Sequence, residues 1–416
     1  MSLRRTMATF LLLPVITMLE AAAWYGAHSV LFLFRIEDVE WGGLGMTTDE
    51  AMAASGTARL LIPLAMLLGG GLAAAMGSQG LLVLGLVLTV PGMALLGAPM
   101  PWVAGLAAAL LVLGHGLTRP GLMGTAAATL RGRSEHLRTA LVALVYAAIN
   151  IGAILGPACA PAVQTQLGYG PLFMACAALM LVALVAAALL GGATLLTCKE
   201  VAAKPEPTPG NGKLLLGAAG LGALVFLPWI GMLQSWELAW RIFDASPLPP
   251  PFEHLWTMAN PLACLFTGVS VATVAGGLHL AKLRAPAPFA MALGLLMLAL
   301  GQALILVTGT TGSPWPALLG LVVAGMGEAV LMVFLISRML GDLHWRLVAL
   351  VMAVWLGLSD AGTQLLSWLG GTLELEWWFE AVGWTSVGSA VLAALVLAAL
   401  AIPAQRKLWT ADQASS

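Results

Sequence analysis

The stretch Gly114-His115-Gly116-Leu117-Thr118-Arg119-Pro120-Gly121 places a guanidinium well inside an apolar segment that runs from about Trp102 to Thr129. A charge at that depth of a bilayer costs at least ~3 kcal/mol on insertion scales. It is tolerated where the side chain faces a water-filled cavity and meets an acid. Three other apolar segments carry such an acid, namely Glu20, Glu328 and Asp360. The sequence therefore predicts a polar cavity inside a bundle of membrane-spanning helices.

The composition is that of a polytopic membrane protein. Hydrophobic residues make up 60% of the chain and charged residues only 9%, which excludes a soluble globular domain. The short basic start at Met1–Arg5 precedes an apolar run that is too long for the core of a signal peptide. The net charge of -1 gives no reason to expect a nucleic-acid partner. The four cysteines are scattered without metal-ligand spacing, so we expect no metal site and no cofactor.

Twelve stretches are long and apolar enough to cross a bilayer, for which a helix needs roughly 20 residues. They lie at about 8–34, 50–76, 80–98, 102–130, 137–165, 170–195, 214–243, 256–281, 287–308, 315–340, 346–371 and 381–403. The polar stretch 199–213, rich in proline and glycine, separates the first six from the last six. We therefore predict an all-α membrane protein with an N-terminal six-helix bundle at 1–198, a cytoplasmic linker at 199–213 and a C-terminal six-helix bundle at 214–416. Two such bundles are typical of transporters with a binding site at mid-membrane.

The basic residues predict the orientation in the membrane. In this arrangement one side holds Arg4, Arg5, Arg131, Arg133, Arg138, Lys199, Lys204, Lys213, Lys282, Arg284, Arg338, Arg346, Arg406 and Lys407. The other side holds the acidic residues Glu37, Asp38, Glu40, Asp49, Glu50, Glu253, Glu374, Glu376 and Glu380. Because positive charge stays inside, both termini and the linker are expected to be cytoplasmic. A multi-pass protein of a bacterial inner membrane, working as a monomer, is the expected setting.

Charged residues within or at the edges of the spans are the candidates for function. They are Glu20, Arg59, Arg119, Glu237, Arg241, Glu328 and Asp360. The alternative for each is a buried pair that only holds two helices together, and Glu237 and Arg241 lie one turn apart and can pair with each other. Arg119 falls in the first bundle and Glu328 in the second, so together they provide a cation and an anion for the two ends of a zwitterion. An arginine also offers a carboxylate a planar fork that a lysine lacks.

Three spans of the first half carry recognisable motifs. Glu20-Ala-Ala-Ala-Trp24-Tyr25-Gly26 is similar to a degenerate Glu-x-x-Glu-Arg-Phe-x-Tyr-Tyr-Gly. Gly114-x-Gly116-x-x-Arg119-Pro120 is similar to Gly-x-Gly-x-x-Lys-Pro, with arginine for lysine. Tyr146-Ala-Ala-Ile-Asn150-Ile-Gly152 resembles Phe-Tyr-x-x-Ile-Asn-x-Gly. In these motifs the sequence resembles the proton-dependent oligopeptide transporters of the major facilitator superfamily.

Motifs in the second half continue the resemblance in the same order. Trp229 followed by Gln234-Ser235 resembles Phe-Trp-x-x-x-x-Gln-x-Ser with a shortened spacing, and Asn260-Pro261 matches an Asn-Pro of the family. Gly327-Glu328 matches Gly-Glu, and Met352-Ala-Val-Trp355-Leu resembles Met-x-x-Trp-Phe-Leu. The resemblance implies the two-bundle major facilitator fold.

The resemblance also implies a role for each matched residue. Glu328 is expected to hold the amino terminus of a peptide and Arg119 its carboxylate. Asn150 and Asn260 are expected to contact the peptide backbone, and Gln234 is also expected to bind the substrate. The side-chain pockets are expected to be lined by Tyr25, Tyr146 and Trp355. Glu20 is expected to take part in proton coupling.

The proton-coupling residues depart most from the family pattern. Thr17 stands where the family has its first glutamate, and Ala21 stands where it has its arginine. If Glu20 and Arg119 pair in the empty state, protonation of Glu20 would free Arg119 for the substrate carboxylate. Asp360, which has no equivalent in the family pattern, is either a second proton site or a structural cap.

Two histidines add to this picture. An unperturbed histidine titrates near neutral pH, which makes His28 and His115 candidates for proton transfer, although a lone histidine in a span is more often a packed polar residue. We include His28 among the proton-coupling candidates because it follows Tyr25-Gly26 closely.

The predicted function is proton-coupled symport of di- or tripeptides, or of peptide-like zwitterions, by alternating access. Besides the substrate, it is expected to need a proton gradient and a lipid bilayer. Two alternatives remain: an exporter or antiporter for another amphiphilic metabolite, and a transport-inactive membrane receptor. An enzyme is not expected, because the sequence has no metal-ligand cluster, phosphate loop or nucleophile-base arrangement.

Overall fold

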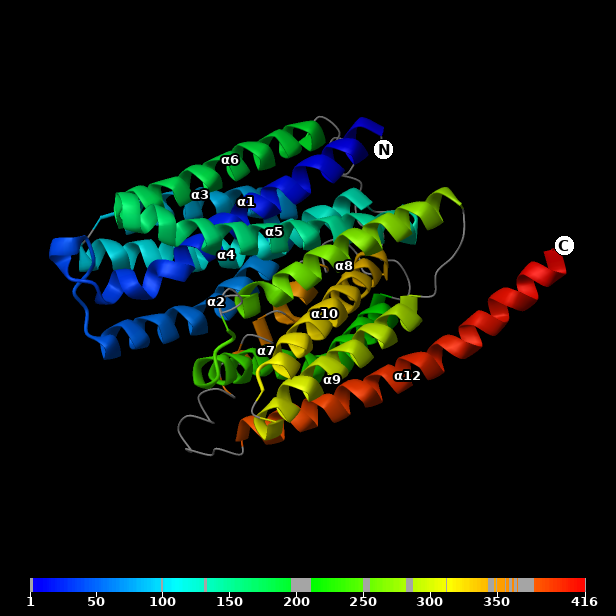
Figure 1. Cartoon of the computed structure of the whole chain (residues 1–416). Helices are drawn as coiled ribbons and strands as arrows, with labels where there is room; N and C mark the ends of the chain where they lie inside the picture. The colour runs from blue at the N-terminus through cyan, green and yellow to red at the C-terminus, as the bar shows by residue number, and fades with distance from the viewer. Residues whose placement is uncertain are drawn as a thin grey trace. The chain divides into compact units, whose positions relative to one another are not determined.

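The structure, a computed structural model, describes most of the chain. It covers residues 3–98, 100–130, 133–195, 211–249, 255–281, 287–311, 313–342, 348, 350–355, 357–358, 361–362, 365 and 378–415. The first-half helices are α1 (Leu3–Ile36), α2 (Thr48–Met76), α3 (Ser78–Leu96), α4 (Pro101–Leu130), α5 (Glu135–Leu167) and α6 (Tyr169–Leu195), with the 3-10 turn η1 (Val39–Trp41) after α1. The second-half helices are α7 (Asn211–Ala245), α8 (Leu255–Leu280), α9 (Ala287–Thr311), α10 (Trp315–Asp342) and α12 (Trp378–Ser415). Figure 1 labels these helices along the chain.

The helices coincide with the predicted spans wherever the structure describes them. Within the described residues, ten helices are long and apolar enough to cross a membrane, and α7 contributes a shorter apolar stretch at Gly222–Leu233. The predicted span 346–371 lies largely outside the described residues, although positions 350–355 within it are helical. The predicted linker lies outside them up to residue 210, so the division of the chain at that linker stays a prediction. The predicted all-α membrane fold is confirmed, because every element in the described residues is a helix and ten of these helices can cross a membrane. A helix satisfies its backbone polar groups internally, as a span in lipid must.

Local sequence signals set where several helices begin and end. Thr47 and Glu50 form a capping box at the start of α2, in which each side chain bonds the other's backbone N–H. Gly77, with a φ of 83°, separates α2 from α3, and Gly168, with a φ of 88°, separates α5 from α6. These left-handed conformations favour glycine, which lets the chain reverse within one residue.

The helices form two compact units. Unit 1 comprises Met1–Gly132, Ala148–Leu215 and Leu340–Ala361, and unit 2 comprises Arg133–Ala147, Leu216–Met339 and Gly362–Ser416. The boundary falls inside α5, whose first segment belongs to unit 2 and whose remainder belongs to unit 1. The residues of each candidate cluster described below lie within a single unit.

Small residues let the helices of unit 1 approach closely around α4. A Cβ added to Gly114 would lie 2.6 Å from Cγ2 of Thr89 and 2.8 Å from the carbonyl oxygen of Gly85, both on α3. On the other side of α4, a Cβ added to Gly116 would lie 2.4 Å from Cβ of Ala65 and 2.9 Å from the backbone nitrogen of Met66, both on α2. Such close backbone contact is typical of helix packing in membranes. The hydrophobic effect does not drive helices together in lipid, and small residues allow the close van der Waals packing that does.

We expect the substitution Gly114→Ala to destabilise the protein. The added methyl overlaps α3, and overpacking of this kind costs about 1–3 kcal/mol. Gly105→Ala on the same helix is the matched control, because a Cβ there meets nothing within 4 Å. Thermal unfolding in detergent measures both variants. Equal melting temperatures for the two would contradict the close packing of α3 against α4.

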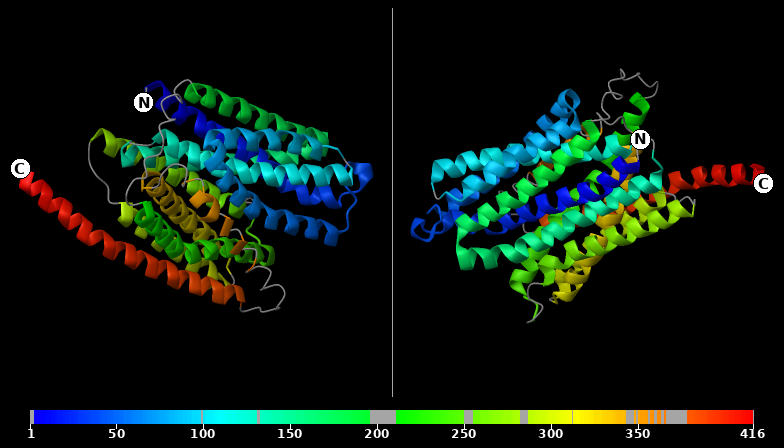
Figure 2. Two further views of the ribbon diagram at one scale, coloured as in Figure 1. Left: turned by 180° about the vertical axis from the view of Figure 1, so that it is seen from behind. Right: turned by 90° about the horizontal axis from the view of Figure 1, so that it is seen from above.

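Unit 2 combines an apolar cluster with a buried polar contact. Phe243 stacks on Trp256 with ring centroids 5.2 Å apart, within a cluster that joins α7, α8, α9 and α10. Ser386 of α12 donates to Oε1 of Gln302 on α9 at 2.8 Å, and Gln302 donates to the carbonyl oxygen of Pro228 on α7 at 3.2 Å. α9 and α12 lie side by side, and α12 continues beyond the end of α9 in both views of Figure 2.

Candidate functional site

Glu20 of α1 meets two basic side chains of α4 inside unit 1. Oε1 of Glu20 lies 3.0 Å from Nδ1 of His115, and Oε2 lies 3.7 Å from a terminal nitrogen of Arg119. The Glu20 side chain is only 2% exposed and that of Arg119 is 18% exposed. His115 and Arg119 are four residues apart on a helix, which puts them on the same face. The expected pair of Glu20 with Arg119 is therefore present, and a histidine joins it.

Aromatic contacts hold this cluster in place. The Trp24 ring stacks on the His115 ring, with centroids 3.8 Å apart and planes 10° from parallel. The His28 ring lies 4.1 Å from the Trp24 ring, and His28 Nδ1 lies 2.9 Å from the Trp24 carbonyl oxygen. Because a carbonyl only accepts, the proton of a neutral His28 sits on Nδ1. His28, predicted to couple protons, is exposed and is linked to the cluster through Trp24.

Glu328 of α10 is the centre of a second cluster, which lies within unit 2. The Tyr146 hydroxyl donates to Oε1 of Glu328, and Nδ2 of Asn260 donates to Oε2 at 3.2 Å. Tyr146 belongs to the first segment of α5, and Asn260 belongs to α8. Hydrogen bonds to a carboxylate are stronger than neutral ones, so two donors hold this side chain in one orientation.

Cys264 adds a thiol next to this second cluster. Its Sγ lies 3.5 Å from Oδ1 of Asn260, one helical turn away on α8, and 3.1 Å from the carbonyl oxygen of Gly325 on α10. Asn260 therefore directs its amide nitrogen to Glu328 and its amide oxygen toward the thiol, whose single proton also faces the carbonyl oxygen of Gly325. The arrangement presents a carboxylate, oriented by an amide and a phenol, that suits a ligand ammonium group.

The remaining predicted site residues fall in several places. Asn150 on α5 and Trp355 are buried in unit 1, and Tyr25 on α1 is 37% exposed. The side chain of Gln234 and the whole of Asp360 lie outside the described residues. The structure therefore brings together Glu20 with Arg119, and Tyr146 and Asn260 with Glu328. The roles of all these residues stay predictions.

Sequence reasoning did not include His115 or Cys264 in the predicted site. Both carry a signal that could have found them, because each stands four residues from a predicted site residue on the same helix, His115 before Arg119 and Cys264 after Asn260. Within the part of the chain that the structure describes, no group of three or more His, Cys, Asp or Glu side chains is placed to hold a metal ion.

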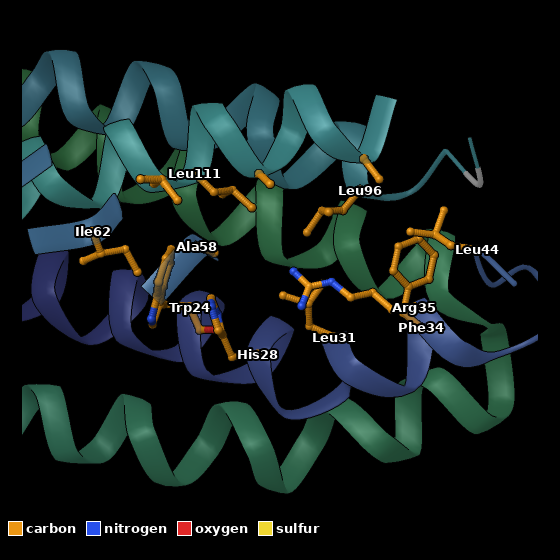
Figure 3. A pocket seen from close by; sticks show the side chains of 13 residues that line it. Trp24, His28, Leu31, Phe34, Arg35, Leu44, Ala58, Ile62, Leu96 and Leu111 are labelled. Atoms are coloured by element: carbon orange, nitrogen blue, oxygen red, sulfur yellow. The ribbon is translucent and has the colours of Figure 1, made fainter. Parts of the chain in front are cut away.

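A cavity of about 50 Å³ lies inside unit 1, beside the first cluster. Trp24, His28 and Arg35 of α1 line it together with apolar side chains of α2, α3 and α4. Figure 3 shows the Arg35 and His28 side chains directed into it from one helix. Arg35 also bonds Ser55 of α2, so its guanidinium is held at the cavity wall. The cavity has room for a few water molecules, which its polar side chains can bond.

Comparisons with known proteins agree with the resemblance seen in the motifs. The sequence profile of the POT family matches residues 75–197. The chain is 24% identical over 222 residues to dipeptide and tripeptide permease B of Edwardsiella piscicida, a match that covers 52% of this chain and 43% of that protein. The match to this curated relative therefore spans less than half of its length.

Solved structures show the same fold over nearly the whole chain. A peptide transporter POT in complex with sulfate superposes with a TM-score of 0.65 at 20% identity, covering 95% of this chain and 94% of that one. The human organic anion transporter MFSD10 (TETRAN) superposes with a TM-score of 0.70 at 16% identity, covering 94% and 99%. The protein is a multi-pass helical membrane protein with the two-bundle major facilitator fold, and its resemblance to the proton-dependent oligopeptide transporter (POT) family is confirmed.

Proposed function

We propose that this protein is a secondary active transporter that carries di- or tripeptides, or peptide-like zwitterions, together with protons by alternating access. The observation that carries the proposal is the carboxylate of Glu328, oriented by Tyr146 and Asn260. A buried acid held by two donors is a counter-ion for the ammonium group at one end of a peptide. Arg119 supplies the opposite charge for the peptide carboxylate, and its planar fork suits that group.

The cluster around Glu20 supports coupling to protons. Arg119 lies 3.7 Å from Glu20, so the acid competes with a substrate carboxylate for the guanidinium. Protonation of Glu20 removes its negative charge and releases Arg119 to the substrate. The proton gradient then drives accumulation, because substrate binds more tightly to the protonated protein.

The relatives support a peptide-like substrate and a bacterial setting. The curated relative is a dipeptide and tripeptide permease of a bacterium, and a similar solved structure is a peptide transporter. We infer from the basic residues that both termini face the cytoplasm of a bacterial inner membrane. We also infer that the protein acts as a monomer.

Uptake into proteoliposomes tests this function. We expect labelled dialanine to accumulate when the outside is more acidic than the inside, and only to equilibrate when the gradient is collapsed with an ionophore. Unlabelled dialanine should compete fully. N-acetylated or carboxyl-amidated dialanine should compete at least about 10-fold more weakly, because each lacks one charged hydrogen bond.

Two outcomes would contradict the proposal. Folded protein that takes up no peptide under any gradient would exclude peptide import and leave an exporter of another amphiphile or a transport-inactive receptor. Equal competition by the end-blocked peptides would show that the protein does not recognise the zwitterion.

A further inference from the structure

The closest polar contact of Glu20 in its cluster is to a histidine. Nδ1 of His115 lies within hydrogen-bond distance of Glu20 at 3.0 Å, whereas the nearest Arg119 nitrogen, at 3.7 Å, makes an ion pair that is longer than a hydrogen bond. A carboxylate can only accept a hydrogen bond, so His115 carries a proton on Nδ1 while Glu20 is ionised. The two groups are thus joined along a path that a proton can follow.

His115 is fixed in a geometry that suits proton exchange. Its side chain is 7% exposed, and the Trp24 ring stacks on it in near-parallel contact. The ring therefore cannot turn away from Glu20 without losing the stack. Trp24 acts here as a positioning residue that keeps Nδ1 directed at the carboxylate.

Few other ionisable groups surround this pair. α4 packs against α1, α2 and α3. Near the pair, α2 over residues 60–76 and the whole of α3 contain no ionisable side chain. α1 contributes Glu20, Tyr25 and His28, and α4 itself contributes Arg119. Two further helices pack against α1: α5, whose part in unit 1 contains Cys159 as its one ionisable side chain, and α6, which contains Tyr169 and Cys176. The protonation states within the cluster therefore depend mainly on the charges of Glu20, His115 and Arg119. His28 is separated from His115 by the Trp24 ring.

The neighbouring positions of α1 explain why a partner from α4 is needed. Thr17 and Ala21 occupy the positions where the first-span motif of the oligopeptide transporters has a glutamate and an arginine. Thr17 donates to the carbonyl oxygen of Leu13 within its own helix, and Ala21 is fully buried. Neither residue can exchange a proton with Glu20 near neutral pH. Within the described residues, His115 lies at hydrogen-bond distance from Glu20 and has a side chain that can gain and lose a proton, whereas Arg119 stays protonated.

We propose that His115 and Glu20 together carry the coupling proton. The inference rests on the proposed function. A proton arriving at Nε2 of neutral His115 makes an imidazolium, and the Nδ1 proton then passes to Oε1 of Glu20. The products are a neutral imidazole protonated on Nε2 and a neutral carboxylic acid. Arg119 has then lost the negative charge it faced and can bind the substrate carboxylate, and release of the proton reverses these steps.

The substitution His115→Asn tests this inference. The asparagine amide nitrogen sits where Nδ1 sits on the side chain, so it can still donate to Glu20, but it does not titrate. His136→Asn at the start of α5 is the matched control. Two assays are compared in proteoliposomes: peptide exchange at equal concentrations without a gradient, which needs no net proton movement, and accumulation driven by an inward proton gradient.

We expect His115→Asn to exchange peptide within about 3-fold of the unsubstituted protein and to lose gradient-driven accumulation at least 10-fold. His136→Asn should retain both activities. Retained accumulation in His115→Asn, with an unchanged dependence on the gradient, would overturn the inference. Loss of exchange together with accumulation would also overturn it, because His115 would then serve substrate binding or folding.

A second measurement needs no substrate and separates this inference from the proposed function. Nitrogen-15 NMR of histidine-labelled protein in lipid follows the six histidines through a pH titration, and the signal missing in His115→Asn identifies His115. We expect the ring nitrogens of His115 to change protonation state within the titration, and Glu20→Gln to change the pH at which they do so. If the protein moves no peptide but His115 titrates in this way, the peptide assignment fails and the proton site stands. A His115 that keeps one protonation state throughout, in protein that accumulates peptide, would overturn the inference.

Discussion

Replacing Glu328 by glutamine is expected to reduce gradient-driven peptide uptake by about 10- to 100-fold. A hydrogen bond to a charged group contributes about 1.5–3 kcal/mol, and each 1.4 kcal/mol is tenfold in affinity. Tyr146 and Asn260 both donate to the carboxylate, so a glutamine offers one oxygen to two donors and turns its NH₂ toward one of them. The variant loses the counter-charge for the ligand ammonium group and also the fixed orientation of the side chain. Initial uptake rates over a range of peptide concentrations measure the effect.

The control for this variant is Glu380→Gln, which makes the same change at an exposed position near the start of α12. It should leave uptake within about 2-fold of the unsubstituted protein. Competition with N-acetylated peptide gives a second readout: the unsubstituted protein should prefer the free amine, and Glu328→Gln should lose most of that preference. Unchanged uptake and unchanged preference in Glu328→Gln would exclude Glu328 as the group that binds the amine.

The sequence predicted the helices well because the bilayer restricts what a chain can do. Every described α-helix overlaps one of the predicted apolar segments, since a segment of about 20 apolar residues has no alternative to a helix in lipid. The starts and ends were less predictable: α12 continues to Ser415, beyond the apolar segment that ends near residue 403. A helical extension beyond the bilayer has water available for its backbone, so hydropathy does not mark where the helix ends.

The contacts between helices were predictable only in part. The pairing of Glu20 with Arg119 followed from charge, because a buried cation needs an acid. The contact of His115 with Glu20 depends on the rotation of α1 and α4 about their axes, which glycine contacts with neighbouring helices determine. Composition and hydropathy do not report that rotation. A spacing of four residues puts two side chains on the same face of a helix. This spacing links His115 to Arg119 and Cys264 to Asn260, and it is the sequence signal by which both residues could have been added to the predicted site.

Replacing Arg119 by glutamine is expected to abolish measurable uptake, a loss of at least about 100-fold, and to lower thermal stability. The peptide carboxylate loses its cation, and Glu20 is left with His115 as its remaining basic partner within the described cluster. Removing one member of a buried ion pair costs about 3–5 kcal/mol, because the other charge stays buried. Arg119→Lys should keep uptake within about 10-fold, since it retains the charge and loses only the planar fork. Melting temperatures and uptake rates are measured together on the same preparations.

The double variant Glu20→Gln/Arg119→Gln separates binding from folding. Removing both charges removes the unpaired carboxylate, so the melting temperature should return most of the way to that of the unsubstituted protein. Uptake should stay abolished, because the peptide carboxylate still lacks its cation. Glu380→Gln, at an exposed position near the start of α12, should change neither quantity. If the double variant regained uptake with its stability, Arg119 would serve the fold through its pairing with Glu20, and the carboxylate of the substrate would bind elsewhere.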